Sequence, residues 1–371
     1  MLKIIDDLIN KDYLFKQSIR FSTLSVNLTI LSNFDMKDSI KHYFPESNSE
    51  GCDNISIISL ASEDIYNQIY GKLANYTPFK KRKMHKSQNS DVYIYDIKCF
   101  QIWNDEQNNF ILIKENNEKY YVIFKENLNG AIYLVRIIRE LYYELMEKNN
   151  NLMLHAAAFE WNNKGILVCG SKCSGKTTTL IRFLDDKANF ISNDRVFLKK
   201  ENKENYFLSY FPLPIRIGLG TMINSKLSNF TDNNEFYRKQ NIDTVSKEEL
   251  IKFGCPVKYE VTPHELTKFY DCRFLETTVL DYIIFPKYIP NYNGFLLEPV
   301  NKSDVLSSLI DCCMTPRDDD WPDRWIMNNE NNLLEAIENA VSVLEDITKK
   351  YPSYKLLFGN QLFEPETLKI K

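Results

Sequence analysis

The stretch GILVCGSKCSGKTTTL, residues 165–180, decides how this chain is interpreted. Its beginning, GILVC, is a short apolar run typical of a buried strand, and its end, TTTL, begins a helical pattern. Between them, residues 170–177 match the Walker A pattern G-x-x-x-x-G-K-[ST], which is meaningful only when a strand precedes the loop and a helix follows it. Both conditions are met in a chain with only 11 glycines. We therefore interpret the stretch as a phosphate-binding loop (P-loop) rather than as an incidental glycine turn.

The loop predicts a site for a nucleotide and its magnesium ion. Glycines allow backbone N–H groups to turn inward around phosphate oxygens, and the N-terminus of the following helix adds a partial positive charge. Lys176 is expected to neutralise the β- and γ-phosphates, and the Thr177 hydroxyl to ligate Mg²⁺. ATP and Mg²⁺ are therefore the expected cofactors. The expected nucleotide-binding residues are Gly170, Ser171, Lys172, Cys173, Ser174, Gly175, Lys176, Thr177 and Thr178.

The composition predicts a folded, cytoplasmic protein with two domains. The chain has 371 residues, of which 44% are hydrophobic, and this length exceeds what one ordinary small core organises. Because 46 basic residues are balanced by 50 acidic ones, no overall field favours nucleic acid or an anionic membrane as a partner. The N-terminal apolar residues are interrupted by Asp6, Asp7 and Asp12, unlike a secretory signal, and no later run approaches a membrane span. The sequence leaves open whether the chain forms a homo-oligomer.

The pattern of apolar residues predicts an α/β (α+β) protein with two different halves. Short runs with period-two alternation recur from about residue 20 to residue 126 and predict a mostly antiparallel sheet. Apolar residues at helical spacing over 132–145 predict a long amphipathic helix that ends this half. We therefore expect a sheet-rich recognition domain over residues 1–149 and a P-loop domain with a mixed sheet over residues 150–371. The basic run at 79–90 is expected to be a solvated loop, or else a contact for an acidic partner.

Two polar residues near the loop are candidates for chemistry. Asp194 ends the short apolar run of FISNDRVFL, one helix downstream of Lys176. A carboxylate there can return to the phosphate end of the loop, where it would hold Mg²⁺ or accept a proton from an attacking hydroxyl. The spacing fits a turn residue that caps the strand almost as well. His155, in LMLHAAAF, fits a hydrogen-bonded core residue better than a catalytic one when its own pattern is considered alone.

Arginines further along the chain are candidate phosphate or substrate contacts. Arg216, in FPLPIRIGLG, follows two prolines and is either a phosphate clamp or an ion-paired, solvated arginine. Arg238 lies in the polar stretch EFYRKQ, which is a candidate substrate loop. The stretch CCMTPRDDDWPDRW, residues 312–325, is either a solvated turn or a docking surface with two tryptophans beside charges.

The order of LHAAAF, a hairpin, GILVCGSKCSGKTT, a helix and FISNDRVFL resembles the ATP-binding domain of the HPr serine kinase/phosphorylase family. Phosphoenolpyruvate carboxykinases share that ATP-binding core, and the recognisable match covers about residues 151–200. The resemblance implies that Lys176 and Thr177 are the phosphate and Mg²⁺ ligands. It further implies that Asp194 is the acid–base and metal carboxylate and that His155 is its polar neighbour.

The loop also departs from that family. Lys172 and Cys173 replace the usual residues in its middle, Thr178 follows Thr177, and Asn193 takes the place of the first aspartate of the usual pair. We find no close counterpart of the segment with which the family's regulators engage HPr. The resemblance therefore implies a divergent, biosynthetic kinase rather than a regulator of sugar uptake.

The function expected from these residues is ATP- and Mg²⁺-dependent transfer of the γ-phosphate to a hydroxyl. The expected acceptor is a serine of a peptide or protein, and otherwise a small metabolite. The alternative, which the sequence leaves open, is a nucleotide-binding regulator that switches the affinity of the N-terminal sheet for a partner with little or no phosphotransfer.

Overall fold

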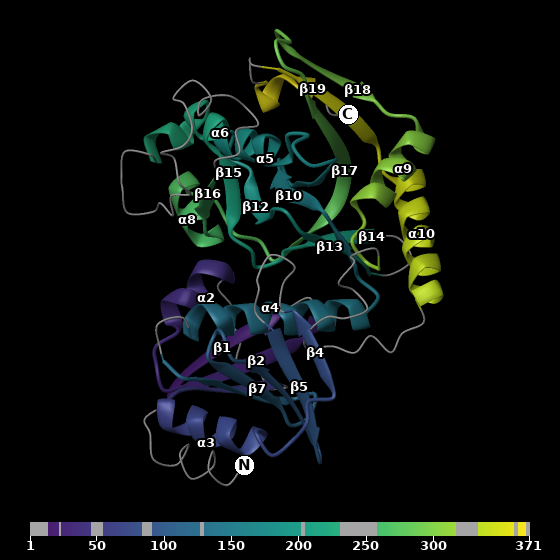
Figure 1. Ribbon diagram of the computed structural model, residues 1–371. Coiled ribbons are helices and arrows are strands. Elements are labelled where there is room, and N and C mark those ends of the chain that lie inside the picture. Colours follow the sequence, from purple (N-terminus) through teal and green to yellow (C-terminus); the bar gives the residue numbers. More distant parts are fainter. Residues whose placement is uncertain are drawn as a thin grey trace. The chain divides into compact units, whose positions relative to one another are not determined.

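The structure is a computed structural model, and it describes residues 14–21, 24–45, 55–83, 91–126, 130–201, 205–230, 258–316, 333–359 and 363–368. It has the mixed α/β character that the sequence predicts, with helices packed on mixed sheets (Figure 1). Contacts divide the described residues into two compact units, one formed by 14–41 and 55–144 and the other by 42–45 and the residues from 145 onward. No helix in this part of the chain is long and apolar enough to span a membrane.

The first unit contains a sheet of eight strands in the order β1-β2-β3-β8-β7-β6-β5-β4. The strands are β1 (Phe15–Phe21), β2 (Val26–Ser32), β3 (Ile55–Ala61), β4 (Lys80–Lys83), β5 (Asp91–Ile97), β6 (Phe100–Asp105), β7 (Phe110–Lys114) and β8 (Lys119–Phe124). Neighbours are antiparallel, except that β3 runs parallel to both β2 and β8. The sheet is therefore mostly antiparallel, and the parallel pairs around β3 go beyond what period-two alternation predicts.

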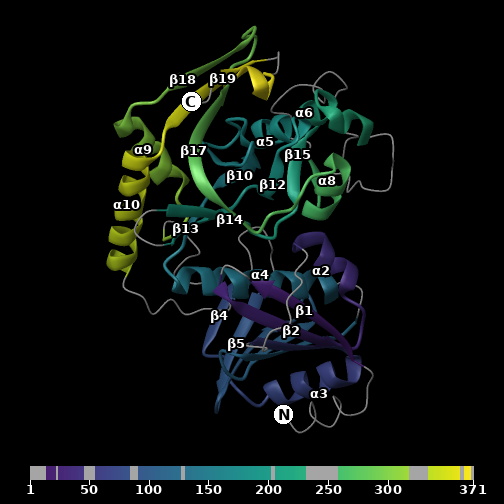
Figure 2. The same ribbon diagram turned by 180° about the vertical axis from the view of Figure 1, so that it is seen from behind.

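Two helices cover opposite faces of this sheet, as Figures 1 and 2 show: α3 (Glu63–Leu73) on one face and α4 (Gly130–Lys148) on the other. α3 buries one apolar stripe in a hydrophobic cluster of aliphatic and tyrosine side chains with the strands beneath it. On the α4 side, the Tyr142 ring stacks on Phe21 with centroids 4.6 Å apart, and Tyr133 lies 5.1 Å from Phe110. The helix predicted from the apolar spacing over 132–145 is thus confirmed. A shorter helix, α2 (Lys37–Tyr43), follows β2.

Residues 80–83 form strand β4, not the solvated loop expected for the basic run at 79–90. These residues have no apolar periodicity, but they pair antiparallel with β5, and the backbone N–H of Phe79 donates to the carbonyl of Ile94. A neighbouring strand that offers backbone partners imposes extended structure on residues whose own pattern does not predict it. Residues 84–90 lie outside the described part of the chain.

The second unit is built on a sheet of nine strands in the order β12-β10-β11-β17-β14-β13-β9, with β19 joining β17 to β18. The strands are β9 (Leu152–Leu154), β10 (Ala156–Trp161), β11 (Lys164–Cys169), β12 (Asn189–Ser192), β13 (Val196–Glu201), β14 (Asn205–Ser209), β17 (Thr277–Tyr288), β18 (Phe295–Pro299) and β19 (Ser353–Phe358). β11 is antiparallel to β10 and parallel to β17, so the sheet is mixed. A separate pair contains β15 (Ile215–Gly218) and β16 (Lys258–Val261).

Among the described residues, the helices of the second unit are α5 (Lys176–Asp185), α6 (Leu219–Ile223), α8 (Pro263–Tyr270), α9 (Lys302–Cys312) and α10 (Leu333–Lys350). The apolar spacing of TTTLIRFLDD, VLSSLIDCC and NLLEAIENAVSVLEDITKKY predicts α5, α9 and α10, and all three are confirmed. α5 packs against β10 and β11, and its Phe183 ring lies 4.5 Å from Phe159. The helix after the loop is therefore anchored to the strand that precedes the loop.

A two-residue turn joins β10 to β11, the strand that leads into the loop. Asn162 and Asn163 connect β10 to β11, with φ values of 51° and 58°. Asparagine tolerates this left-handed conformation, and two such residues in succession form the turn that matches the twist of paired strands. The run LMLHAAAF, expected to be one strand of this hairpin, is divided at His155. Its first part, β9, pairs with β13, whereas β10 pairs with β11 and β12.

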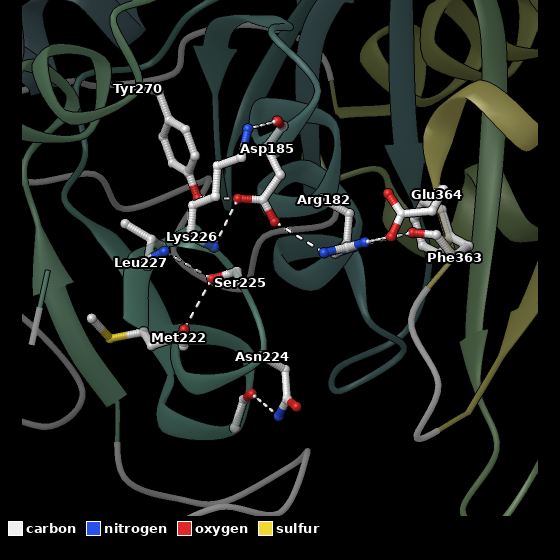
Figure 3. Close-up of polar contacts among 11 residues, drawn as sticks. Arg182, Asp185, Met222, Asn224, Ser225, Lys226, Leu227, Tyr270, Phe363 and Glu364 are labelled. Carbon is white, nitrogen blue, oxygen red and sulfur yellow. Dashed lines mark hydrogen bonds and ion pairs between the residues drawn. The ribbon is translucent and has the colours of Figure 1, made fainter. Parts of the chain in front are cut away.

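A buried polar network holds the C-terminal end of α5 (Figure 3). The Arg182 guanidinium donates to the carbonyl of Phe363 at 3.1 and 3.0 Å. It also forms ion pairs with Asp185 at 3.1 Å and Glu364 at 2.7 Å. Asp185 in turn accepts from the Tyr270 hydroxyl at 3.0 Å. Burial raises the pKa of Asp185, and these donors oppose that shift. The network ties the C-terminal segment of the chain to the helix that begins at the phosphate-binding loop.

Replacing Arg182 by Met is expected to lower the free energy of unfolding by about 3 kcal/mol, because the change leaves the buried Asp185 carboxylate without its cation. Glu364→Gln is the matched control. Its side chain is 71% exposed, and an exposed ion pair contributes about 0–1 kcal/mol. Urea unfolding followed by circular dichroism measures both variants. An Arg182→Met protein as stable as the wild type would contradict this assignment.

Candidate functional site

The loop between β11 and α5 turns tightly and requires glycine at its end. Gly175, the last residue before α5, has a φ of 109°, a region that side chains rarely adopt. A Cβ atom there would lie 2.5 Å from Cζ of Phe358, in β19, so the close approach of that ring also requires glycine. Cys173, near the apex of the loop, has a φ of 64°. The backbone thus reverses tightly before it enters the helix.

Lys176 lies folded across this loop. Its Nζ donates to the carbonyl oxygens of Gly170 at 2.7 Å and Ser171 at 3.0 Å, and the residue is only 9% exposed. Desolvation lowers the pKa of Lys176, while the nearby Cys312 thiol and the Asp194 carboxylate oppose that shift. The ammonium is therefore held inside the loop, where a bound phosphate would meet it.

Other polar atoms of the loop fit a bound phosphate. No side chain caps the N-terminus of α5 at Gly175, so the first-turn N–H groups face the loop without a competing acceptor from that residue. The Ser174 hydroxyl is buried and has no hydrogen-bond partner among the residues that the structure describes. A bound anion would supply an acceptor to both the helix N-terminus and the Ser174 hydroxyl. The residues present therefore fit the phosphate groups of a nucleotide.

Thr177 joins the loop to the turn between β12 and β13. Its Oγ1 donates to Oδ1 of Asn193 at 3.2 Å, and Asn193 is buried. The next residue, Asp194, has a φ of 70°, so the chain turns sharply there, and Asp194 is exposed whereas Asn193 is buried. Asp194 is the turn residue that its spacing allows, and its neighbour Asn193 hydrogen-bonds the expected Mg²⁺ ligand, Thr177.

The Asp194 carboxylate pairs with His155. Nε2 of His155 lies 3.3 Å from Oδ1 of Asp194, and the two side chains are 39% and 56% exposed. This hydrogen bond is the main cause that lowers the pKa of Asp194, and the charges of Arg195 and Lys176 act in the same direction. His155 is therefore not the buried core residue that its own pattern favours. The break between β9 and β10 brings it to the surface beside the loop.

Cys312, at the end of α9, is a member of the site that the sequence did not reveal. Its Sγ accepts the N–H of Gly170 at 3.2 Å, and its carbonyl accepts the N–H of His155 at 2.7 Å. A hydrogen bond with Cys169, together with that of Gly170 and the charge of Lys176, lowers the pKa of the Cys312 thiol. Cys312 is thus hydrogen-bonded both to Gly170, where the loop begins, and to His155, between β9 and β10.

Two of the remaining predicted site residues, Thr178 and Arg216, contact residues outside the loop. Thr178 is buried, and its hydroxyl lies 2.8 Å from that of Thr221 in α6, so this side chain faces α6. Arg216 is 51% exposed and forms an ion pair with Glu260 of β16, which is the arrangement expected if it is not a phosphate clamp. Arg238 lies outside the described residues, as does the acidic and tryptophan-containing part of the 312–325 stretch.

No model of a known protein family matches this chain, and no curated protein sequence matches it either. The resemblance to the HPr kinase family therefore depends on the sequence of the loop, Asp194 and His155 alone.

Proposed function

We propose that this chain is an ATP- and Mg²⁺-dependent phosphotransferase, similar to HPr kinases, that transfers the γ-phosphate to a hydroxyl of a peptide or, otherwise, of a small metabolite. The observation that carries the proposal is the hydrogen bond between Thr177 and Asn193. This bond connects the phosphate-binding loop to the turn that carries the Asp194–His155 pair. A nucleotide-binding loop next to an exposed, ionised carboxylate is what transfer to an external hydroxyl requires.

The residues of the loop would hold the nucleotide. Lys176 and the backbone N–H groups of Ser174 to Thr177 would bind the β- and γ-phosphates, and Thr177 and Asp194 would hold Mg²⁺. Bound Mg²⁺ and ATP supply the phosphoryl group and neutralise its charge. The chain itself contributes a fixed cation and fixed dipoles, which need no rearrangement when the charge spreads.

Asp194 would accept the proton of the attacking hydroxyl. The carboxylate is ionised at neutral pH, and the contact with His155 lowers the pKa of Asp194 further, so it is ready to accept a hydrogen bond from that hydroxyl. A low pKa also makes it a weak base, so its main contributions are to orient the hydroxyl and to receive the proton late in the transfer. His155 orients the carboxylate through the 3.3 Å contact with Oδ1.

The proposal is tested by incubating the purified chain with Mg²⁺, ATP and a panel of serine-containing peptides and hydroxyl metabolites. Intact-mass spectrometry should detect an acceptor that has gained one phosphate group. The alternative, a nucleotide-dependent switch, predicts that ATP binds and changes the affinity for a partner while no acceptor gains phosphate. Nucleotide binding without any phosphorylated product across the panel would overturn the proposed transfer.

A further inference from the structure

Strand β4 forms an edge of the sheet in the first unit. It stands at one end of the strand order and, among the described residues, pairs with β5 alone. Alternate residues of such a strand aim their N–H and C=O groups away from the sheet, where they can pair with another extended chain. We call Tyr76, Phe79 and Lys80–Lys83 the β4 edge.

The β4 edge combines exposed aromatic rings with a strong local positive charge. Tyr76 is 47% exposed and Phe79 is 53% exposed, although large apolar side chains of this unit are otherwise mostly buried. The four strand residues are all basic, in a chain whose net charge is -4. The positive charge is therefore a property of this edge and not of the whole protein.

The contacts of Lys81 leave it able to exchange partners. Its Nζ lies 2.9 Å from Asp91 and 5.3 Å from the centre of the Tyr93 ring, but the Lys81 and Asp91 side chains are 53% and 36% exposed. Exposed ion pairs contribute little stability, so an approaching chain can displace Asp91 from Lys81 at small cost. Like charges disfavour pairing of two β4 edges with each other, which selects an occupant of opposite charge.

We propose that the β4 edge binds an extended acidic peptide as an additional strand. Its backbone would pair with β4, its carboxylates would lie beside Lys80 on one face of the sheet, and its apolar side chains would lie on the opposite face, beside Phe79 and the stem of Lys81. Because side chains alternate along a strand, the fitting sequence alternates acidic and apolar residues. This proposal depends on the proposed function in one respect: it identifies the bound peptide as the one that carries the acceptor hydroxyl. Recognition then uses a segment separate from the phosphorylated residue.

Backbone pairing distinguishes a peptide from nucleic acid. Phosphates would also be attracted to Lys80 and Lys81, but a nucleic-acid backbone has no N–H and C=O groups spaced to continue a ladder of strand hydrogen bonds. A test must therefore separate charge attraction from backbone pairing.

The experiment measures fluorescence anisotropy of a labelled octapeptide of alternating Glu and Val with the full chain, without ATP. We expect binding that weakens as salt increases. N-methylation of one set of alternate residues should weaken it at least about tenfold, because each methyl group removes a donor and blocks the approach of β4, whereas N-methylation of the other set should have little effect. Lys80→Glu/Lys81→Glu should weaken binding at least about tenfold through repulsion.

The matched control is Lys349→Glu/Lys350→Glu, which reverses two adjacent exposed lysines at the end of α10 and changes the net charge equally. This variant should bind the peptide as the wild type does. The proposal is overturned if both N-methylated peptides bind equally well, if the control weakens binding as much, or if an oligothymidylate displaces the peptide as readily as unlabelled peptide does. If Lys80→Glu/Lys81→Glu fails to fold by circular dichroism, the N-methylated peptides with wild-type protein decide. No step needs ATP, so failure of phosphotransfer and failure of docking are distinguishable.

Discussion

Asp194→Asn is expected to lower the rate of phosphotransfer about 10²- to 10⁴-fold while ATP binding changes little. Asparagine keeps the size of the side chain and tolerates the φ of 70° at this turn, so the backbone should be preserved. It cannot accept the proton of an attacking hydroxyl, and it ligates Mg²⁺ more weakly than a carboxylate does. Single-turnover transfer and isothermal titration with ATP measure the two effects separately.

Asp271→Asn is the control for this exchange. Asp271 ends α8 with a φ of 49°, is exposed, and lies in the same unit, so the chemical change and the backbone requirement are the same. Its transfer rate should equal that of the wild type. If Asp194→Asn transfers phosphate as fast as Asp271→Asn, then Asp194 has no part in the reaction, and the proposed role of the His155 pair is lost with it.

The parts of the site that sequence patterns predict are those determined by neighbouring residues. The loop, α5 and the nearby turn at Asp194 all lie within 165–201, where motif spacing and apolar periodicity specify local structure. The pattern around His155 predicts a core position, because it does not show that β9 and β10 take different partner strands. Exposure of His155 follows from that division.

Contacts between distant residues account for what the sequence did not predict. Cys312 lies 142 positions from Gly170, and neither residue carries a local signal that they hydrogen bond. The basic run at 79–90 has no strand pattern, and β4 forms there because β5 supplies its backbone partners. Both features depend on tertiary packing, which overrides local propensity.

Lys176→Met is expected to abolish the stabilisation of the protein by Mg²⁺ and ATP. Methionine keeps most of the apolar stem but removes the ammonium, which lies 2.7 Å from the Gly170 carbonyl inside the loop. Hydrogen bonds to charged groups contribute about 1.5–3 kcal/mol, so the dissociation constant for ATP should rise by about 10- to 150-fold. Differential scanning fluorimetry should then detect a large ligand-induced rise in Tm for the wild type and little or none for the variant.

The same experiment without ATP has a different expected result. Burial lowers the pKa of Lys176, which means that folding disfavours its charged form, so removing the charge relieves a cost at neutral pH. That gain offsets the loss of the hydrogen bonds to Gly170 and Ser171, and the Tm of the ligand-free variant should stay close to that of the wild type. Lys268→Met is the control, because Lys268 is exposed in α8, outside the loop, and should keep the ATP-dependent shift. If Lys176→Met keeps the full ATP-dependent shift, the loop does not bind phosphate through this lysine, because the ammonium then contributes nothing to the ligand-bound state.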